Sequence, residues 1–348
     1  MPHVAFCSFR LGGSDGVSVV ADSWARSFGQ LGWTTSRVAG EGPVDVIVPG
    51  LELGTDRAPD AAAVAEALAG ADLVVVENLL TIPMNLPAAR VVADVLTGRP
   101  AILHHHDPPW QRTHFAHITE LPPDDPAWVH VTINELTRAQ FADRGLAATT
   151  IYNGFDTAVA PGDRTATRAA LGVAEGEVLV AHPVRAIERK NIPAAVAVAE
   201  ALGGVYWLPG PPEDGYGPTL DAILADTRCR VLRHAIEDLD PSATMADLYA
   251  AADLVAFPST WEGFGNPPLE AAIHRRPAVV GRYPVADELQ RFGFWWLDPD
   301  DHAAIAAAVA RPPTERLADN RRLVEEHFSL DVVTRRVKEL LDQAGFGV

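Results

Sequence analysis

The sequence predicts an α/β protein made of two similar units. Short apolar runs alternate with amphipathic or alanine-rich stretches, which is the pattern of parallel strands joined by covering helices. This rhythm starts again after a stretch at 153–163 that contains Gly, Pro and Asp and has no periodicity. The length of 348 residues also exceeds one core of typical size. We therefore expect domains at 1–158 and 159–330, followed by a terminal helix within 331–348.

Each element follows from a local pattern. In the first half, the predicted strands are 4–9, 45–48, 73–76, 101–105, 130–133 and 149–152, and the predicted helices are 16–31, 61–69 and 135–144. In the second half, the predicted strands are 178–181, 205–208, 230–232, 254–257, 278–280 and 294–297, and the predicted helices are 302–310 and 330–342. The proline-rich segment 107–126 favours neither state, so we expect a functional loop there.

Composition excludes several classes of protein. The net charge of -18 opposes wide contact with nucleic acid or anionic lipid. No apolar run reaches the roughly 18 residues of a membrane span, and no export signal begins the sequence, so we expect no stable membrane association. Cys7 and Cys229 form neither a disulfide framework nor a zinc knuckle, and we interpret them as buried thiols of a cytoplasmic protein.

The strongest local pattern is the segment 258–271, which follows a predicted strand. Pro267 occupies the position of a first helical residue, with Asn266 as its cap, so nearby amides should lie at a positive helix end that suits phosphate or sugar oxygens. Glu270 lies one turn inside this helix and can accept from a ribose diol. Glu262, in the preceding loop, can reach the neighbouring sugar. A purely structural turn is the alternative interpretation.

A concentrated basic segment follows the first strand of the second half. Arg185, Arg189 and Lys190 lie within six positions of an otherwise acidic chain, and Lys190 and Lys338 are its two lysines. Arginine binds phosphate through two hydrogen bonds and lysine acts as a point charge, so the segment suits a diphosphate. The alternative is a solvated loop with ordinary surface charges.

A glycine-containing turn follows the first predicted strand. Gly12, Gly13 and Gly16 allow close approach of the backbone and leave helix amides directed at a ligand. Because Ser14 takes the place of the second glycine, the turn departs from the dinucleotide pattern G-x-G-x-x-G. The alternative is a tight turn in which Ser14 or Asp15 caps the helix.

Three consecutive histidines end a predicted strand. Strand alternation places His104 and His106 on one face and His105 on the other, at the sheet edge where ligands bind in parallel sheets. A metal site would need three or four converging ligands, for which His114 and His117 are the further candidates. The alternative is that His104 is a buried, hydrogen-bonded residue without a functional role.

The segment 258–271 resembles the E-x(7)-E motif of retaining glycosyltransferases of the GT-B fold, particularly family 4 (group 1), which reads roughly P-S-x-x-E-G-F-G-x-P-x-L-E-A. Residues 247–253 resemble the helix before that motif, and 152–156 resemble the interdomain turn P-N-G-V-D, with Tyr152 in place of the proline. The resemblance covers most of the chain and is weak at 40–100 and 107–126. It implies two Rossmann-like domains with a cleft between them and a terminal helix that crosses back onto the N-terminal domain.

The resemblance also implies roles for individual residues. A nucleoside-diphosphate sugar would bind the C-terminal domain and an acceptor the N-terminal domain. Arg185 and Lys190 would bind the diphosphate, Glu270 the ribose, and Glu262 and His106 the donor sugar. Backbone contacts to the donor would come from Gly12, Gly13, Gly16, Gly263, Phe264, Gly265, Asn266 and Pro267.

Together these observations predict a retaining hexosyltransferase that uses a UDP- or GDP-sugar, a soluble hydroxyl acceptor, and neither cofactor nor metal. Asp298 and Asp300 imitate a metal-binding D-x-D motif, but we expect them to cap the helix 302–310. Three alternatives remain: a phosphorylase with pyridoxal phosphate on a buried lysine, an epimerase or hydrolase of sugar nucleotides, and a noncatalytic sensor of sugar nucleotides. No residue discriminates among UDP-glucose, UDP-N-acetylglucosamine and GDP-mannose.

Overall fold

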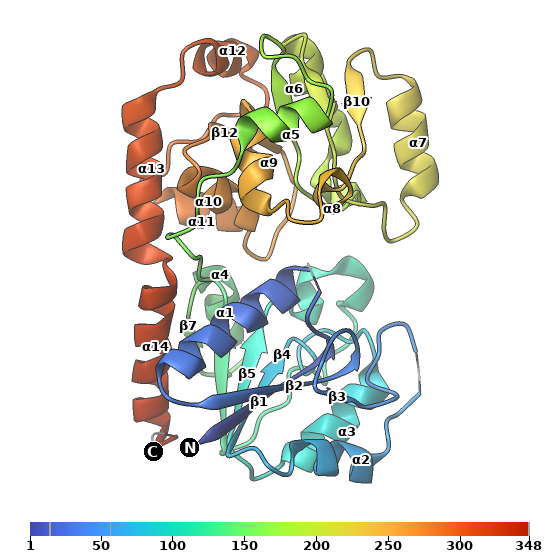
Figure 1. Cartoon of the computed structure of the whole chain (residues 1–348). Helices are drawn as coiled ribbons and strands as arrows, with labels where there is room; N and C mark the ends of the chain where they lie inside the picture. The colour runs from blue at the N-terminus through green and yellow to red at the C-terminus, as the bar shows by residue number, and fades with distance from the viewer. Residues whose placement is uncertain (14, 56, 347–348) are drawn as a thin grey trace. The chain divides into compact units, whose positions relative to one another are not determined.

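The computed structural model describes residues 1–13, 15–55 and 57–346, and the chain divides into two units (Figure 1). Unit 1 comprises Met1–Phe155 and Phe328–Val348, and unit 2 comprises Asp156–His327. The boundary that we expected at 158/159 therefore lies just inside unit 2, and the chain returns to unit 1 at Phe328 rather than at residue 331. Residues 347 and 348 of the expected terminal segment lie outside the described residues.

Unit 1 is built on a parallel sheet. Within the described residues the sheet has seven strands in the order β3-β2-β1-β4-β5-β6-β7. They are β1 (His3–Arg10), β2 (Thr34–Glu41), β3 (Val46–Ile47), β4 (Leu73–Glu77), β5 (Ala101–His105), β6 (Trp128–Thr132) and β7 (Ala148–Thr150). Strand order reverses between β1 and β4, and ligands of open parallel sheets bind at the carboxyl ends of strands at such a point.

Helices cover both faces of the unit 1 sheet. They are α1 (Gly16–Gln30), α2 (Ala61–Leu68), α3 (Leu86–Leu96), α4 (Glu135–Ala142) and α14 (Leu330–Ala344), and the loop after β5 contains the 3-10 turns η1 (Pro109–Gln111) and η2 (Thr113–Phe115). Helix α14 packs beside α1 (Figure 1). Trp24 of α1 and Val337 of α14 are fully buried in one core, and Thr334 of α14 donates to the Ser27 hydroxyl over 3.0 Å.

Unit 2 repeats this architecture. In the part of the chain that the structure describes, its parallel sheet has five strands in the order β10-β9-β8-β11-β12. They are β8 (Leu179–Ala181), β9 (Val205–Trp207), β10 (Arg230–Leu232), β11 (Leu254–Phe257) and β12 (Ala278–Val280). The helices are η3 (Glu188–Lys190), α5 (Arg164–Ala170), α6 (Ile192–Ala201), α7 (Gly217–Ala225), α8 (Ile236–Leu239), α9 (Met245–Ala251), α10 (Asn266–Ile273), α11 (Pro284–Gln290), α12 (His302–Ala310) and α13 (Thr314–His327).

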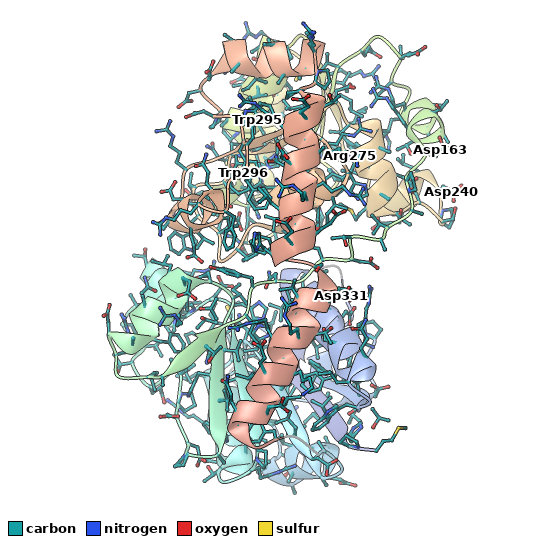
Figure 2. The ribbon with its side chains drawn as sticks, turned by 90° about the vertical axis from the view of Figure 1, so that its left-hand side faces the viewer. Asp163, Asp240, Arg275, Trp295, Trp296 and Asp331 are labelled. Atoms are coloured by element: carbon teal, nitrogen blue, oxygen red, sulfur yellow. The ribbon has the colours of Figure 1, made fainter. Side chains whose placement is uncertain are left out.

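The predicted α/β class is confirmed, while several local predictions need correction. The predicted elements did not include the strand β2 or the helices α3, α5, α6, α7, α8, α11 and α13. The predicted strand at 294–297 is wrong, because this segment makes one isolated bridge, between Leu297 and Val279. The Asn320 side chain of α13 instead bonds the backbone N and O of Trp295, both over 2.8 Å, and Figure 2 shows Trp295 and Trp296 beside this helix.

Two smaller corrections concern side chains. Cys7 is buried, as predicted, but Cys229 is half-buried. Asp301, rather than Asp298 or Asp300, caps α12, and the Asp298 carboxylate pairs with Arg282. A membrane-spanning helix is not found in the described part of the chain.

Candidate active site

The loop between β11 and α10 carries the two motif glutamates of unit 2. Helix α10 begins at Asn266, and its cap is Gly265 rather than the predicted Asn266. Gly265 has φ +99°, in the left-handed region, and a Cβ there would overlap the hydroxyl of Tyr283. Pro267 and Pro268 have no N–H groups, so the amides at this helix end come from Gly265 and Asn266. This helix end therefore offers fewer amides to an anion than the motif suggests.

Glu262 and Lys190 meet in a buried ion pair, although 72 positions separate them. Lys190 Nζ donates to Glu262 Oε1 over 2.7 Å, and Arg189 pairs with the other carboxylate oxygen. Burial lowers the pKa of Lys190 to about 8, with the positive charge of Arg189 adding to the effect and Glu262 opposing it. Burial alone would raise the pKa of Glu262, but Lys190 and Arg189 outweigh it and lower that pKa. The structure thus joins two sequence-predicted site residues into one charged cluster.

Arg185 lies in the loop after β8 and makes a different ion pair. Its guanidinium bonds the carboxylate of Glu213, and both side chains are about one third exposed. The backbones of the two segments are also joined, because the Ala186 amide donates to the carbonyl of Pro211 over 2.8 Å and the Glu213 amide donates to the carbonyl of Ala186 over 3.1 Å. Arg185 lowers the pKa of Lys190 through its charge. Arg185 and Lys190 therefore act within one electrostatic environment, while each is held by its own carboxylate.

Glu270 lies in α10, where α9 contributes its main partner. The hydroxyl of the buried Tyr249 donates to the Glu270 carboxylate. The ring of His274 stacks on Tyr249 with centroids 5.0 Å apart and planes 8° from parallel. Burial raises the pKa of Glu270, and the hydrogen bond from Tyr249 opposes that rise. The carboxylate that we assigned to a ribose is therefore held in place by a neighbouring helix.

The glycine turn of unit 1 has one of the two caps that the alternative interpretation predicts. Asp15 caps α1 and accepts hydrogen bonds from the amides of Val17 and Ser18. These amides consequently face a carboxylate of the protein. Gly12 has φ +80°, and a Cβ there would lie 2.7 Å from the carbonyl oxygen of Pro43, so the turn requires glycine for backbone geometry. The other predicted cap, Ser14, lies outside the described residues.

His104 and His105 end β5 and His106 follows it; His104 and His106 lie on one face and His105 on the other, as strand alternation predicts. His104 Nδ1 and His106 Nε2 both contact the carboxylate of Glu77 at the end of β4, over 3.0 and 2.8 Å. His104 and Glu77 are fully buried, and the side chain of His106 is 6% exposed. Of the described residues, these three form the group whose ligand atoms lie within 4.8 Å of one another.

The opposite face of β5 carries a chain of hydrogen bonds. His105 Nδ1 contacts the Thr81 hydroxyl over 2.7 Å, and His105 Nε2 contacts His130 Nδ1 over 2.9 Å. His130 Nε2 then contacts the carboxylate of Asp124 over 3.0 Å. Burial lowers the pKa of His105 and of His130, so both rings are neutral at pH 7. Both ring nitrogens of His105 are therefore held by partners within the protein.

Sequence reasoning missed Glu77, Tyr249 and Glu213 as partners of site residues. Each lies between 21 and 29 positions along the chain from the residue that it contacts. A signal did exist for Glu77, which is an acidic residue at the end of the apolar run of β4. Parallel pairing with β5 places Glu77 opposite His104.

Known proteins resemble this chain in both sequence and fold. A family model described as "Glycosyl transferases group 1" matches residues 214–312. The mannosylglucosylglycerate synthase of Petrotoga mobilis is 26% identical over 263 residues, which cover 62% of this chain and 60% of that protein. The D-inositol 3-phosphate glycosyltransferase of Segniliparus rotundus is 35% identical over 173 residues, which cover 45% of this chain and 37% of that protein. The chain thus spans 60% or less of the length of these relatives.

Solved structures match over nearly the whole chain. The crystal structure of Anabaena HepE in complex with UDP and glucose has a TM-score of 0.72 and 17% identity, and covers 99% of this chain and 100% of that chain. Sucrose-phosphate synthase from Thermosynechococcus elongatus has a TM-score of 0.71 and 15% identity, and covers 100% of both chains. The chain is therefore related to the group 1 glycosyltransferases and has the GT-B fold.

Proposed function

We propose that the chain is a cytoplasmic retaining glycosyltransferase that moves a hexosyl group from a nucleoside-diphosphate sugar to a hydroxyl group of a soluble acceptor. The observation that carries this proposal is the buried cluster of Lys190, Arg189 and Glu262, which lies in the same unit as Glu270. The cluster supplies cations for a diphosphate and one carboxylate for a sugar hydroxyl, and Glu270 supplies the carboxylate for the ribose hydroxyls. We assign donor binding to unit 2. We assign acceptor binding to unit 1, which also contains His106, a residue that we expect to contact substrate.

The chemistry follows from charge. As the bond between the sugar and the diphosphate breaks, negative charge grows on the leaving phosphate, and Lys190 and Arg185 stabilise it. Glu262 accepts from a donor-sugar hydroxyl and Glu270 from the ribose. When the acceptor hydroxyl attacks on the face that the diphosphate leaves, a phosphate oxygen takes its proton and the anomeric configuration is retained. This route uses no enzymic nucleophile.

Neither a metal ion nor another cofactor is part of the proposal. Cationic side chains supply the charge that a metal would otherwise bring to the diphosphate. Asp298 and Asp300, which resemble a metal-binding D-x-D motif, make other contacts. The Asp298 carboxylate pairs with Arg282 and accepts a hydrogen bond from the amide of Asp300. Lys190, the buried lysine that a pyridoxal phosphorylase would require, is held by Glu262.

A small, polar acceptor is favoured. The names of two relatives, a mannosylglucosylglycerate synthase and a D-inositol 3-phosphate glycosyltransferase, refer to small polar molecules. The segment 59–72 around α2, where membrane-associated relatives would carry a basic amphipathic helix, contains Asp60, Glu66 and Asp72 and no cation.

Two measurements test this function. A thermal-shift panel of nucleoside diphosphates identifies the base, because a ligand of the native state raises the melting temperature. Proton spectra of reactions with a matching donor, with and without an acceptor, then identify the product. We expect transfer with retained configuration that persists in the presence of chelator. An inverted linkage, or activity lost on chelation and restored by manganese, would contradict the mechanism.

The same spectra separate the alternatives. An epimerase or hydrolase would turn over the donor without an acceptor, and a sensor would bind the donor without turnover. The substitution Lys190→Ala tests whether the charged cluster takes part in transfer. Loss of one charge-stabilising contact should lower kcat/KM by roughly 10- to 1000-fold. A folded Lys190→Ala protein with the wild-type rate would remove Lys190 from the site.

A further inference from the structure

The buried carboxylate of Glu77 holds the ring of His106. The Oε2 atom lies 2.8 Å from His106 Nε2, and the exposed fraction of Glu77 is 0%. Its second imidazole contact, to His104 Nδ1, is 3.0 Å long. A carboxylate that receives two imidazole N–H groups in a buried site is well compensated for its loss of water.

The next residue holds the backbone of the same histidine. The Oδ1 atom of Asn78 accepts from the amide of His106 over 3.0 Å and from that of Asp107 over 3.1 Å. The amide of Asn78 in turn donates to the carbonyl of His104 over 2.9 Å. Asn78 adopts φ 60°, a left-handed conformation that asparagine tolerates better than most residues. Glu77 and Asn78 thus fix both the side chain and the main chain of His106.

The protonation pattern of the cluster follows from its charges. Burial alone would raise the pKa of Glu77, but the charges and hydrogen bonds of His104 and His106 outweigh it and lower that pKa to about 2. An ionised carboxylate has no proton to donate, so Nε2 of His106 and Nδ1 of His104 must each carry one. Burial lowers the pKa of His104, which keeps its other nitrogen unprotonated.

The spacing of the ligand atoms favours direct hydrogen bonds over a bound cation. The contacts of 2.8 and 3.0 Å lie within the normal range for N–H···O bonds. Two ligands of a tetrahedral zinc ion, each about 2.05 Å from the metal, would lie about 3.3 Å apart. The cluster is therefore built as a pair of imidazoles on one carboxylate.

We propose that Glu77 is a positioning residue, which locks the His106 ring with the proton on Nε2 and presents Nδ1 as the ring atom that accepts a hydrogen bond from a substrate hydroxyl. Within the described residues, no hydrogen bond to His106 Nδ1 is found, whereas Nε2 is committed to Glu77. The inference rests on the proposed function, which assigns to His106 of unit 1 a contact with substrate. It adds the group that fixes which nitrogen makes that contact.

The first experiment needs no enzymatic activity. Nitrogen-15 spectra of the full chain with labelled histidine give the tautomer of each ring, and a His106→Gln variant assigns the His106 signals. We expect a protonated Nε2 and an unprotonated Nδ1 in the neutral ring of wild-type His106. In Glu77→Leu this preference should be lost. A wild-type His106 with its proton on Nδ1 would refute the proposal, even if transferase activity is confirmed.

The second experiment measures transfer. Glu77→Gln keeps one acceptor oxygen but removes the charge, and Glu77→Leu removes both, so we expect kcat/KM to fall by roughly 10-fold and 100-fold, the scale for loss of a residue that orients a functional histidine. Thr81→Val is the matched control, because it removes a buried hydrogen bond to His105 on the other face of β5. Its kcat/KM should stay within about twofold of wild type, since surrounding polar contacts are otherwise unchanged.

A double variant separates positioning from a general structural role. If Glu77 acts through His106, adding Glu77→Gln to His106→Ala should lower kcat/KM no further than His106→Ala alone. Independent, multiplicative losses would overturn the proposal. So would one equivalent of zinc that copurifies with the wild-type chain and is absent from Glu77→Gln. If the wild-type protein transfers no sugar, the proposed function fails while the tautomer measurement still decides the role of Glu77.

Discussion

The hydroxyl of Tyr249 in α9 donates a hydrogen bond to the carboxylate of Glu270 in α10. Tyr249 is fully buried, and its ring is stacked against His274, so the Tyr249 hydroxyl has little freedom to move. One oxygen of Glu270 is thereby fixed and the direction of the other is set. In a site that binds a ribose through its hydroxyl groups, this contact determines how accurately the Glu270 carboxylate is positioned to accept hydrogen bonds from those hydroxyl groups.

Tyr249→Phe should therefore weaken donor binding. The change removes one hydrogen bond to a charged group and leaves the ring in place. We expect donor KM to rise about 10-fold with little change in kcat, because the ribose contact is equal in the ground and transition states. Glu270→Gln should act in the same direction. Steady-state kinetics check this, and an unchanged KM in a folded Tyr249→Phe protein would contradict it.

The ion pair of Lys190 and Glu262 should contribute to stability as well as to activity. Removing one partner of a buried pair typically costs about 3 to 5 kcal/mol. Glu262→Gln leaves two cations beside a neutral amide, whereas Lys190→Met leaves Glu262 paired with Arg189, so we expect Glu262→Gln to be the more destabilising. The unfolding transition of unit 2 in urea measures both. The double variant should be less destabilised than the sum of the single ones, and strict additivity would argue against coupling.

Activity should fall at alkaline pH because of Lys190. Burial lowers the pKa of Lys190 to about 8, so this side chain loses its charge above that pH, whereas an ordinary lysine keeps it past pH 9. We expect kcat/KM for the donor to decline with an apparent pKa near 8. Lys190→Arg, if active, should keep its rate to higher pH, since arginine stays protonated. A profile that remains flat to about pH 9.5 would exclude a required Lys190 charge.

Stability should fall at acid pH because of His182. Its Nδ1 contacts the Tyr206 hydroxyl over 2.8 Å, and burial, together with the charge of Lys190, lowers its pKa from 6.5 to about 3. Between these values the unfolded chain binds a proton that the folded chain does not, so the free energy of unfolding decreases as pH falls through that window. From pH 7 to 5 this amounts to about 2 kcal/mol.

Two variants test this assignment of the acid sensitivity. His182→Gln should show a shallower pH dependence of unfolding, because the titrating group is gone. Tyr206→Phe should lose stability at both pH values while keeping the wild-type slope. Urea titrations of unit 2 at pH 7 and 5 supply the comparison. Equal slopes in His182→Gln and wild type would mean that other groups account for the effect.

Gly265→Ala should disturb the start of α10. The residue has φ +99°, which costs an L-amino acid about 1 to 2 kcal/mol, and a Cβ would also overlap the Tyr283 hydroxyl. We expect a lower melting temperature and weaker nucleotide binding. Gly176→Ala in the same unit is the control, since no atom lies within 4 Å of the position its Cβ would take. Similar effects of the two substitutions would show that the cap geometry is unimportant.

The fold could be predicted best where short apolar runs are flanked by polar residues. The strands β10, β11 and β12 and the helix α12 have the bounds that the sequence predicts. The strand β2 escaped prediction because its sequence, Thr-Thr-Ser-Arg-Val-Ala-Gly-Glu, is largely polar and exposed at both ends. The aromatic run at 294–297 misled in the opposite way, since the side chain of Asn320 takes the backbone groups that a strand would use.

The residue types of the candidate site could be predicted from the sequence, but the contacts between these residues could not. Glu262 and Lys190 were selected from separate motifs, but their ion pair depends on how the loops after β8 and β11 meet. Glu77 lies 27 and 29 positions from its two histidine partners, and only the parallel register of β4 and β5 brings them together. Local periodicity carries no information about such register.

The placement of α14 has a consequence for the order in which the chain becomes native during synthesis. Residues 156–327 are continuous, so every residue of unit 2 is translated before α14. Unit 1 must wait, because Val333, Val337 and Leu340 of α14 belong to the same core as Trp24 of α1. Until α14 has been translated and packs into this core, the apolar face of α1 that it covers stays exposed to solvent.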